Sequence, residues 1–257
     1  MQKKKLGKGK KAIIIIVAIF LVIAVPVLAF FVRFERGISS YNQGLQLVSQ
    51  GQYAESLECF ERSLRVALPD SRRASALYYL GVAHMELDNF EESITYSLEA
   101  EKIYRTLPDA DQKRLYELYF NLGFSYDEMG NPDESLAWYS KSLESMEALP
   151  DVNQLDKASV YFNMGITYRQ QKKHEEAVEC LVKSYRIRES ELGEEHAKTK
   201  KALDELFIVH LSILESEGLL GYLSYDYLDN LKPEDEQQIK EELQESFDTW
   251  LSAQLAE

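Results

Sequence analysis

Apolar residues recur along most of the chain at every third or fourth position, in segments separated by glycine, proline and asparagine. This spacing predicts amphipathic helices. The octapeptide YFNLGFSY at 119–126 returns as YFNMGITY at 161–168, which is 42 residues later. A repeat period of about 20 to 50 residues is typical of a solenoid, in which one helical unit stacks on copies of itself. The pattern therefore predicts an all-α fold built from repeated pairs of helices.

A glycine marks the repeat, because glycine inside a helix costs about 1 kcal/mol relative to alanine and seldom recurs in phase by accident. It occurs at intervals of 37, 42 and 42 residues, at Gly44, Gly81, Gly123 and Gly165. Beyond each glycine a second amphipathic segment begins, at Tyr53, Phe90, Pro132 and His174. Small residues recur within these second segments, which indicates that the two helices of each pair approach closely.

The tripeptide Leu-Pro-Asp separates the pairs, at 68–70, 107–109 and 149–151. Proline lacks the amide proton that a helix needs and disfavours a helical residue before it, so each tripeptide ends a unit. The predicted units extend over about 39–70, 74–108, 116–150 and 158–192, with a partial fifth unit from 197.

These units resemble tetratricopeptide repeats (TPRs). The resemblance is carried by a large residue, then Leu-Gly or Met-Gly, then Tyr, followed by a turn and by small and aromatic residues in alternation; it is strongest over 119–150. The 42-residue spacing and the junction at 187–203 are similar to the longer repeats of the kinesin light chain type. The fifth unit departs from the pattern, because Phe207 stands where the glycine is expected. The resemblance implies a right-handed superhelical solenoid over residues 39–217.

The C-terminal part, residues 218–257, has no repeat signature. An apolar, tyrosine-rich segment at 219–231 precedes Pro233, which is favourable in the first turn of a last helix, as are the acidic residues that follow it. This helix has one apolar face, made of Ile239, Leu243, Phe247, Trp250 and Leu251. We therefore expect it to cap the end of the solenoid.

Residues 12–32 contain no charged residue, and 21 residues are about the length that a helix needs to cross a hydrocarbon layer of roughly 30 Å. They predict one transmembrane helix, followed by a juxtamembrane linker at 33–38. Six lysines in the tail 1–11 precede the helix, against two arginines just after it, so the tail is expected in the cytoplasm and the repeats outside. The alternative is a signal peptide that is cleaved near Ala29.

Charge is divided unevenly along the chain. The net charge is −14, while the first 36 residues carry six lysines, two arginines and one glutamate, or +7; the remainder therefore carries −21. Such an acidic domain is a poor match for nucleic acid, whose phosphates require a basic surface.

No motif in the sequence predicts catalysis, a metal site or a cofactor. The four histidines, His84, His174, His196 and His210, are not at metal-ligand spacing, and no nucleophile elbow or phosphate-binding loop is present. Cys59 and Cys180 occupy equivalent positions in units one and four and are expected to be small buried residues without a disulfide. Paired carboxylates are interpreted as solvated helix faces.

The TPR resemblance implies that the first helix of each unit lines a concave groove. The residues beside the Leu-Gly pair would then face a partner: Tyr41, Leu45, Tyr78, Val82, Phe120, Phe124, Phe162 and Ile166. This apolar, aromatic set departs from the carboxylate-clamp subgroup of the family, which uses lysine and asparagine there. An exposed apolar patch of this kind is typical of a binding site. The alternative is that some of these side chains pack between units or beneath segment 219–231.

These features together predict a non-catalytic scaffold or adaptor that holds a partner polypeptide at the extracytoplasmic membrane surface. An alternative is a chaperone-like accessory factor for exported or membrane proteins beside a translocation channel. A third possibility is a regulatory module of an enzyme, with an active site in 219–257.

Overall fold

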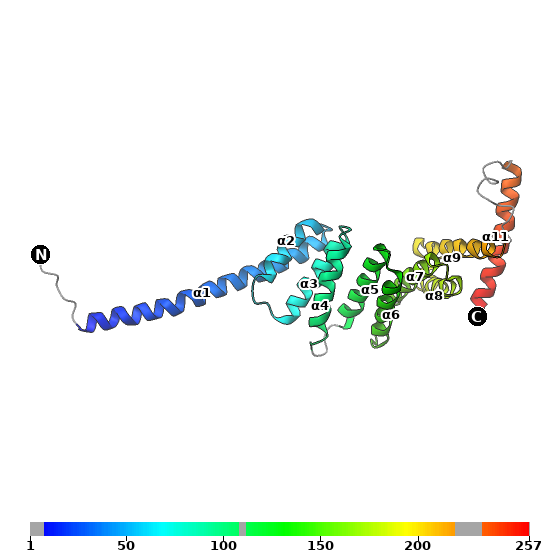
Figure 1. The fold of residues 1–257 in the computed structure, drawn as a ribbon. Coiled ribbons are helices and arrows are strands. Elements are labelled where there is room, and N and C mark those ends of the chain that lie inside the picture. Colours follow the sequence, from blue (N-terminus) through cyan, green and yellow to red (C-terminus); the bar gives the residue numbers. More distant parts are fainter. Residues whose placement is uncertain (1–7, 108–111, 219–232, 257) are drawn as a thin grey trace. The chain divides into compact units, whose positions relative to one another are not determined.

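The computed structural model describes residues 8–107, 112–218 and 233–256, although the side chains of 8–19, 21, 112–113 and 233–240 lie outside the description. The described residues form ten α-helices and no strand, which confirms the all-α prediction (Figure 1). The helices are α1 (Lys8–Ser49), α2 (Tyr53–Leu64), α3 (Asp70–Met85), α4 (Phe90–Tyr104), α5 (Gln112–Glu128), α6 (Pro132–Glu147), α7 (Gln154–Gln170), α8 (His174–Leu192), α9 (Ala197–Ser216) and α11 (Pro233–Ala256).

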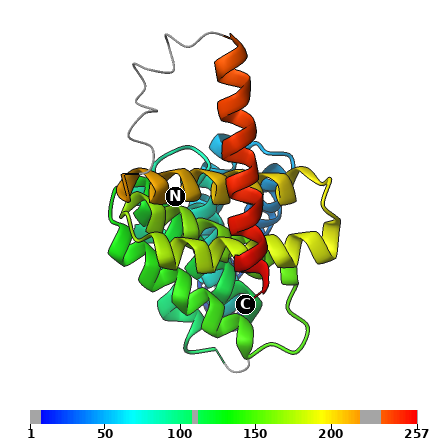
Figure 2. The ribbon, with the colours of Figure 1, turned by 90° about the vertical axis from the view of Figure 1, so that its right-hand side faces the viewer.

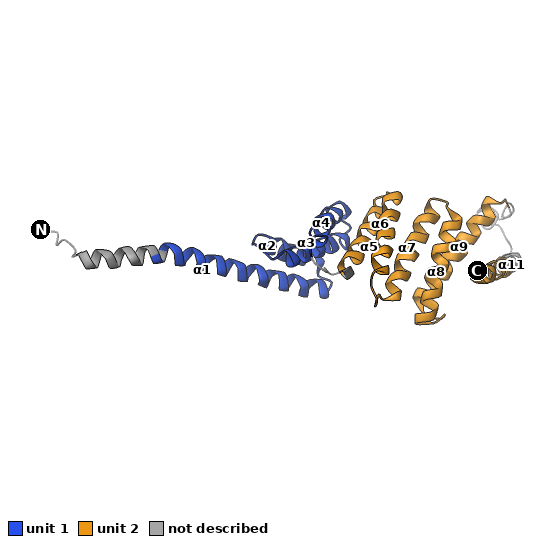
Figure 3. Ribbon diagram, turned by 90° about the horizontal axis from the view of Figure 1, so that it is seen from below, with its two compact units in different colours: residues 1–110 blue, residues 111–257 orange. Residues whose placement is uncertain are grey.

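Two compact units make up the chain, residues 1–110 and residues 111–257 (Figure 3). In the first unit, α1 pairs with α2 and α3 pairs with α4. In the second, α5 pairs with α6, α7 pairs with α8, and α9 packs on α8. Consecutive helices therefore form the predicted pairs, and the boundary between the units falls at the second Leu-Pro-Asp tripeptide.

The four in-phase glycines have one structural cause. Each faces the residue sixteen positions later, on the second helix of its pair: Gly44 faces Phe60, Gly81 faces Ser97, Gly123 faces Tyr139 and Gly165 faces Leu181. A Cβ atom added at these glycines would lie 2.8, 2.5, 2.6 and 2.6 Å from the facing side chain. Since real Cβ contacts are longer, only glycine lets the two helices of a pair reach this separation.

Buried serines connect the two helices of a pair by a hydrogen bond that repeats in the next pair. The Ser142 Oγ on α6 donates to the backbone oxygen of Tyr116 on α5, at 2.8 Å. Forty-two residues later, the Ser184 Oγ on α8 donates to the backbone oxygen of Ala158 on α7, at 2.7 Å. A small side chain keeps the helices close, and the bond satisfies its buried hydroxyl group.

The turns inside the pairs also repeat in phase. Each contains one residue with a left-handed backbone: Gly51 at φ 72°, Asp88 at φ 59°, Gly130 at φ 71° and Lys172 at φ 60°. Their spacing equals that of the helix glycines, 37, 42 and 42 residues. Two of the four positions accept a residue other than glycine, which is why glycine content alone does not reveal this feature.

The predicted linker at 33–38 is not a separate segment. The helix α1 continues without a break from Lys8 to Ser49 and therefore includes both the apolar stretch and the first helix of the first repeat. Gly37 is buried, and a Cβ atom there would collide with the side chain of Val66, just beyond α2. Gly37 therefore serves close packing against this neighbouring segment and does not interrupt α1.

The last helix, α11, packs across the end of the second unit, where it crosses α9 and α8 (Figure 2). The ring of Phe247 lies 5.1 Å from that of Phe207, edge to face, and is 2% exposed. Phe207 stands at the position of the repeat glycine, and its side chain packs on Phe247 of α11. The predicted apolar segment 219–231 lies outside the described residues.

No helix that is long and apolar enough to cross a membrane is found among the residues that the structure describes in full. Residues 12–19 and 21 of the predicted span lie outside that set, and residues 20 and 22–32 lie within it.

Candidate binding surfaces

In the first unit, the residues expected to line a groove lie beside the packed core. Tyr41 and Leu45 on α1 are half-buried and pack against the cluster around Phe60. The Tyr41 hydroxyl group shares a hydrogen bond of 2.7 Å with Ser75 on α3, so this side chain connects the first two repeats. Val82 on α3 is also half-buried.

In the second unit, the corresponding residues follow the same arrangement. Phe120 on α5 is half-buried, and its ring lies 5.8 Å from that of Tyr139 on α6. Phe124 lies one turn further along α5 and is half-buried as well. Ile166 on α7 packs on the core between α7, α8 and α9. Each of these side chains therefore has one side in the core and one side at the surface.

Tyr78 and Phe162 are exceptions, with 7% and 5% of their surface exposed. The ring of Tyr78 packs edge to face on Tyr79, at 5.1 Å. The guanidinium carbon of Arg188 lies 4.3 Å from the centre of the Phe162 ring, a cation–π contact that covers it. The two residues offer little surface to a partner, because they fill space between helices.

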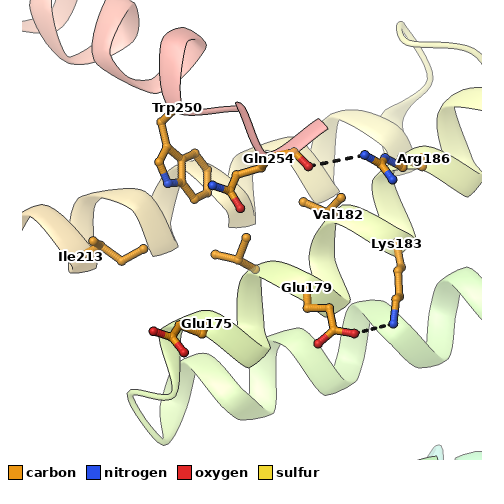
Figure 4. A pocket seen from close by; sticks show the side chains of 9 residues that line it. Glu175, Glu179, Val182, Lys183, Arg186, Ile213, Trp250 and Gln254 are labelled. Atoms are coloured by element: carbon orange, nitrogen blue, oxygen red, sulfur yellow. Dashed lines mark hydrogen bonds and ion pairs between the residues drawn. The ribbon is translucent and has the colours of Figure 1, made fainter. Parts of the chain in front are cut away.

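A second surface, which the sequence did not predict, is a cavity of about 620 Å³ between α8, α9 and α11 (Figure 4). Its apolar lining comes from Val178 and Val182 on α8, Ile213 on α9 and Trp250 on α11. The Nζ of Lys183 donates a hydrogen bond to the Glu179 carboxylate at 2.6 Å beside it, and this bond raises the pKa of Lys183. The cavity exists only because α11 docks here, and no periodicity along the chain encodes that.

Arg186 holds the end of α11 in place. Its guanidinium group donates to the backbone oxygen of Leu255 at 2.7 Å. It also donates to that of Gln254 at 3.4 Å (Figure 4). The last carbonyl groups of a helix have no partner within the helix and carry partial negative charge, so a cation here is favourable. The arginine therefore forms one end of the cavity and fixes α11 on α8.

His210 lies on the opposite side of Trp250, between α9 and α11. It is 3% exposed, its ring centre lies 4.8 Å from that of Trp250, and its Nε2 is 3.2 Å from the Ser246 Oγ. Burial lowers the pKa of His210, while the carboxylate of Glu217 acts in the opposite direction. The neutral imidazole is thus the form that fits between the two helices.

We expect the docking of α11 to weaken in mild acid. The folded-state pKa of His210 is below its ordinary value of 6.5, so the undocked form binds the proton more readily. The neutral ring therefore contributes to the stability of the docked helix above pH 6.5, and this contribution is lost as the pH falls below 6.5. Hydrogen exchange of residues 241–256, followed between about pH 7 and pH 5, should show faster opening in acid after correction for the intrinsic rate.

The charged groups around this histidine allow a control. Glu242 and Glu245 on α11 line a cavity of about 450 Å³ beside it, and both would favour its protonated form. His210→Gln keeps a polar side chain but does not titrate in this range, and its α11 should open equally at both ends of the range. The same acid response in parent and variant would contradict this role for His210.

Neither a metal site nor a disulfide is found in the part of the chain that the structure describes. Cys59 and Cys180 are buried free thiols, as the sequence predicted. Burial raises the pKa of the Cys180 thiol to about 11. Such a thiol remains protonated at neutral pH and behaves as a small apolar group.

Helix pairs with in-phase glycines, repeated serine contacts and repeated turns define an α-helical repeat solenoid, a class of fold that serves as a scaffold for binding proteins and peptides. The Tetratricopeptide repeat family matches residues 36–106, 72–148, 114–190 and 156–209. These overlapping matches cover more than half of the chain, so the chain belongs to the tetratricopeptide repeat family. The resemblance recognised in the sequence is confirmed.

Solved structures of three proteins show a similar fold. The apo form of RapI is 17% identical, with a TM-score of 0.61 over 72% of this chain and 67% of that one. A putative kinesin light chain from Podosopora anserina with nearly identical TPR-like repeats is 16% identical, with a TM-score of 0.56 over 84% of this chain and 96% of that one.

The third is a signal transduction ATPase from Pyrococcus horikoshii with a tetratricopeptide repeat sensor. It is 14% identical, with a TM-score of 0.58 over 79% of this chain and 31% of that one. At these identities the likeness establishes the fold alone. No curated protein sequence matches this chain.

Proposed function

We propose that this protein is a membrane-anchored TPR scaffold that binds partner polypeptides on the extracytoplasmic side. Residues 12–32 would form the anchor, with the lysine-rich tail in the cytoplasm. The apolar sides of the repeat helices would form the surface that receives the partner. Cleavage near Ala29, which would release the repeats, remains the alternative for the N-terminal segment.

The observation that carries this proposal is the exposure of the apolar part of α1. Its large side chains at 20, 22, 23, 25, 27, 28 and 30–32 are between 43% and 72% exposed. Val22 is 72% exposed and Phe20 is 67% exposed. A helix that is apolar on all sides and covered by no other element is stable in a bilayer, where lipid chains cover it, and unfavourable in water.

Each unit is proposed to offer a partner surface on three half-buried residues of the predicted groove, namely Tyr41, Leu45 and Val82 in the first unit and Phe120, Phe124 and Ile166 in the second. None is a lysine or an asparagine, so this surface does not supply cations for an acidic C-terminal tail. The net charge of −21 beyond residue 36 also disfavours acidic ligands. We therefore expect neutral or basic segments with apolar side chains, in an extended or helical form.

A chaperone-like role near a translocation channel is the second candidate. The proposed topology and an apolar surface would both suit newly exported chains. Proximity labelling by the full-length, membrane-inserted protein separates the two roles, because secretion components and many different exported chains would be labelled only in the second.

We expect protease added outside intact cells or spheroplasts to digest residues 37–257 and to spare the tail and the anchor. The reason is the excess of lysine before the apolar segment, which retains that side in the cytoplasm. Immunoblotting with tags at both ends measures the result, and detergent-permeabilised cells show that the tail can be cleaved. Full protection of the repeats would overturn the orientation, and a mature N-terminus near residue 30 would replace the anchor by a signal peptide.

Phe124→Ser is expected to weaken partner capture by about 2 kcal/mol or more, since aromatic anchors at the centre of an interface carry much of the binding energy. Trp138→Ser is the matched control, because this half-buried aromatic residue belongs to the second helix of the same pair. Captured proteins are quantified by mass spectrometry, and circular dichroism verifies the fold of both variants. Equal loss in the two variants, or none in Phe124→Ser, would place the binding surface elsewhere.

A further inference from the structure

In the first unit, the basic residues beyond the apolar segment all lie at one end of the helix pairs. Between residues 33 and 105, every lysine and arginine falls within 33–36, 62–73 or 102–105. No lysine or arginine occurs from 37 to 61 or from 74 to 101, where the turns inside the pairs carry Glu55, Glu86, Asp88, Glu91 and Glu92. The first unit is therefore basic at one end of its helices and acidic at the other.

Contacts within this unit show which end is basic. Gly37 meets Val66 and Gly44 meets Phe60, so α1 and α2 are antiparallel and the end of α2 lies level with residue 37. The hydroxyl groups of Tyr41 and Ser75 share a hydrogen bond, and the ring of Phe60, which faces Gly44, stacks on that of Tyr79 at 5.6 Å. The helix α3 therefore runs parallel to α1, and it begins nearer to the apolar part of α1 than Tyr41 does. The basic end is the one nearest the apolar part of α1, and Figure 1 shows the α2–α3 connection on that side.

The unbroken helix sets the distance between the two features. Gly37 lies five residues beyond Val32, or about 8 Å along the axis at 1.5 Å per residue. By the same measure Tyr41 lies about 14 Å beyond Val32, and the start of α3 lies about one helical turn closer to the level of Val32 than Tyr41 does. Since the headgroup layer extends several Å above the hydrocarbon core, long arginine side chains at these positions reach it.

We propose that the first repeat unit binds an anionic lipid surface through five arginines around the exit of α1: Arg33, Arg36, Arg65, Arg72 and Arg73. All five are exposed, and none forms an ion pair with another residue that the structure describes. Glu35 and Asp70 lie at the same end, so arginines exceed acidic groups by three there. The guanidinium group is suited to phosphate because it presents several donors in one plane.

This inference rests on the proposed membrane anchor, and it adds a consequence. The acidic end of the unit, with the turns inside its helix pairs, would point away from an anionic membrane. Attraction at the basic end would hold the repeat helices upright on the bilayer, with the partner surface along their length accessible from the side.

The test uses full-length protein in vesicles of phosphatidylcholine, with and without phosphatidylglycerol. A fluorophore is attached to the cysteine of Ser71→Cys, an exposed position next to Arg72. The two native cysteines, Cys59 and Cys180, are buried, so the label goes to position 71. A headgroup-attached quencher reports its distance from the lipid surface. We expect stronger quenching in the anionic vesicles, and a return to the phosphatidylcholine value in 1 M salt, where the Debye length is about 3 Å.

The variant Arg65→Gln/Arg72→Gln/Arg73→Gln should lose the additional quenching. Its control removes three positive charges from exposed lysines of the second unit, as Lys172→Gln/Lys173→Gln/Lys198→Gln, and should retain it. Equal quenching in both vesicle types, or equal loss in both variants, would overturn the arginine site and leave the anchor standing. Failure of the parent to resist alkaline extraction from phosphatidylcholine vesicles would instead overturn the anchor, and the arginine site with it.

Discussion

Phe247→Ala is expected to release α11 from the second unit. The free energy with which α11 docks there should fall by about 3 to 5 kcal/mol. The ring is 2% exposed and packs with Phe207 at 5.1 Å and Trp250 at 5.8 Å. Its removal leaves a cavity among apolar side chains that rigid helices cannot fill. Hydrogen exchange should show that residues 241–256 lose protection, and thermal unfolding should begin at a lower temperature.

Ser252→Ala is the matched control, because it truncates an exposed residue of the same helix. It should leave both measurements close to those of the parent, since surface substitutions usually change stability by less than about 0.5 kcal/mol. If residues 241–256 are protected from hydrogen exchange as strongly in Phe247→Ala as in the parent, α11 does not depend on this ring for its docking. The cavity beside Trp250 would then need another explanation.

Gly123→Val is expected to destabilise the second unit by about 3 kcal/mol, at the upper end of the usual cost of overpacking. The added Cβ atom would lie 2.6 Å from two ring carbons of Tyr139, a side chain with no exposed surface. The ring cannot move aside in a filled core, so α5 and α6 must separate. Chemical denaturation measured by circular dichroism gives the change in the free energy of unfolding.

Two further variants separate the steric effect from the helix propensity of valine. Ala137→Val adds the same side chain at an exposed position of α6 and should cost under about 1 kcal/mol. Gly123→Ala adds only the Cβ atom, and we expect its cost to fall between those of the other two. A Gly123→Val protein that unfolds with the parent would refute close packing as the cause of the glycine repeat.

Much of the repeat architecture was predictable because its determinants are local. The octapeptide that begins at Tyr119 and recurs at Tyr161 predicts a helix by its spacing alone, and the glycine in each copy predicts a close neighbour. The structure adds that the neighbour is always the residue sixteen positions later. The serine bond from Ser142 and its copy at Ser184 follows the same period.

The candidate binding surface was predictable only in part. A helix face can be assigned from periodicity, but the exposure of one side chain depends on residues of other helices. Phe162 is buried because Arg188, from α8, covers its ring. Phe120 has the equivalent place on α5, 42 residues earlier, and remains half-buried.

The sequence by itself determined the helix pairs, their period and the family, because each depends on short-range spacing and on the conformational limits of glycine and proline. Only the tertiary structure decided that α1 continues through 33–38, that α11 docks on Phe207, and that five arginines gather where α1 leaves the repeats. These features join residues that are distant in the chain. Packing of one helix on another selects them, and no local period of the sequence records it.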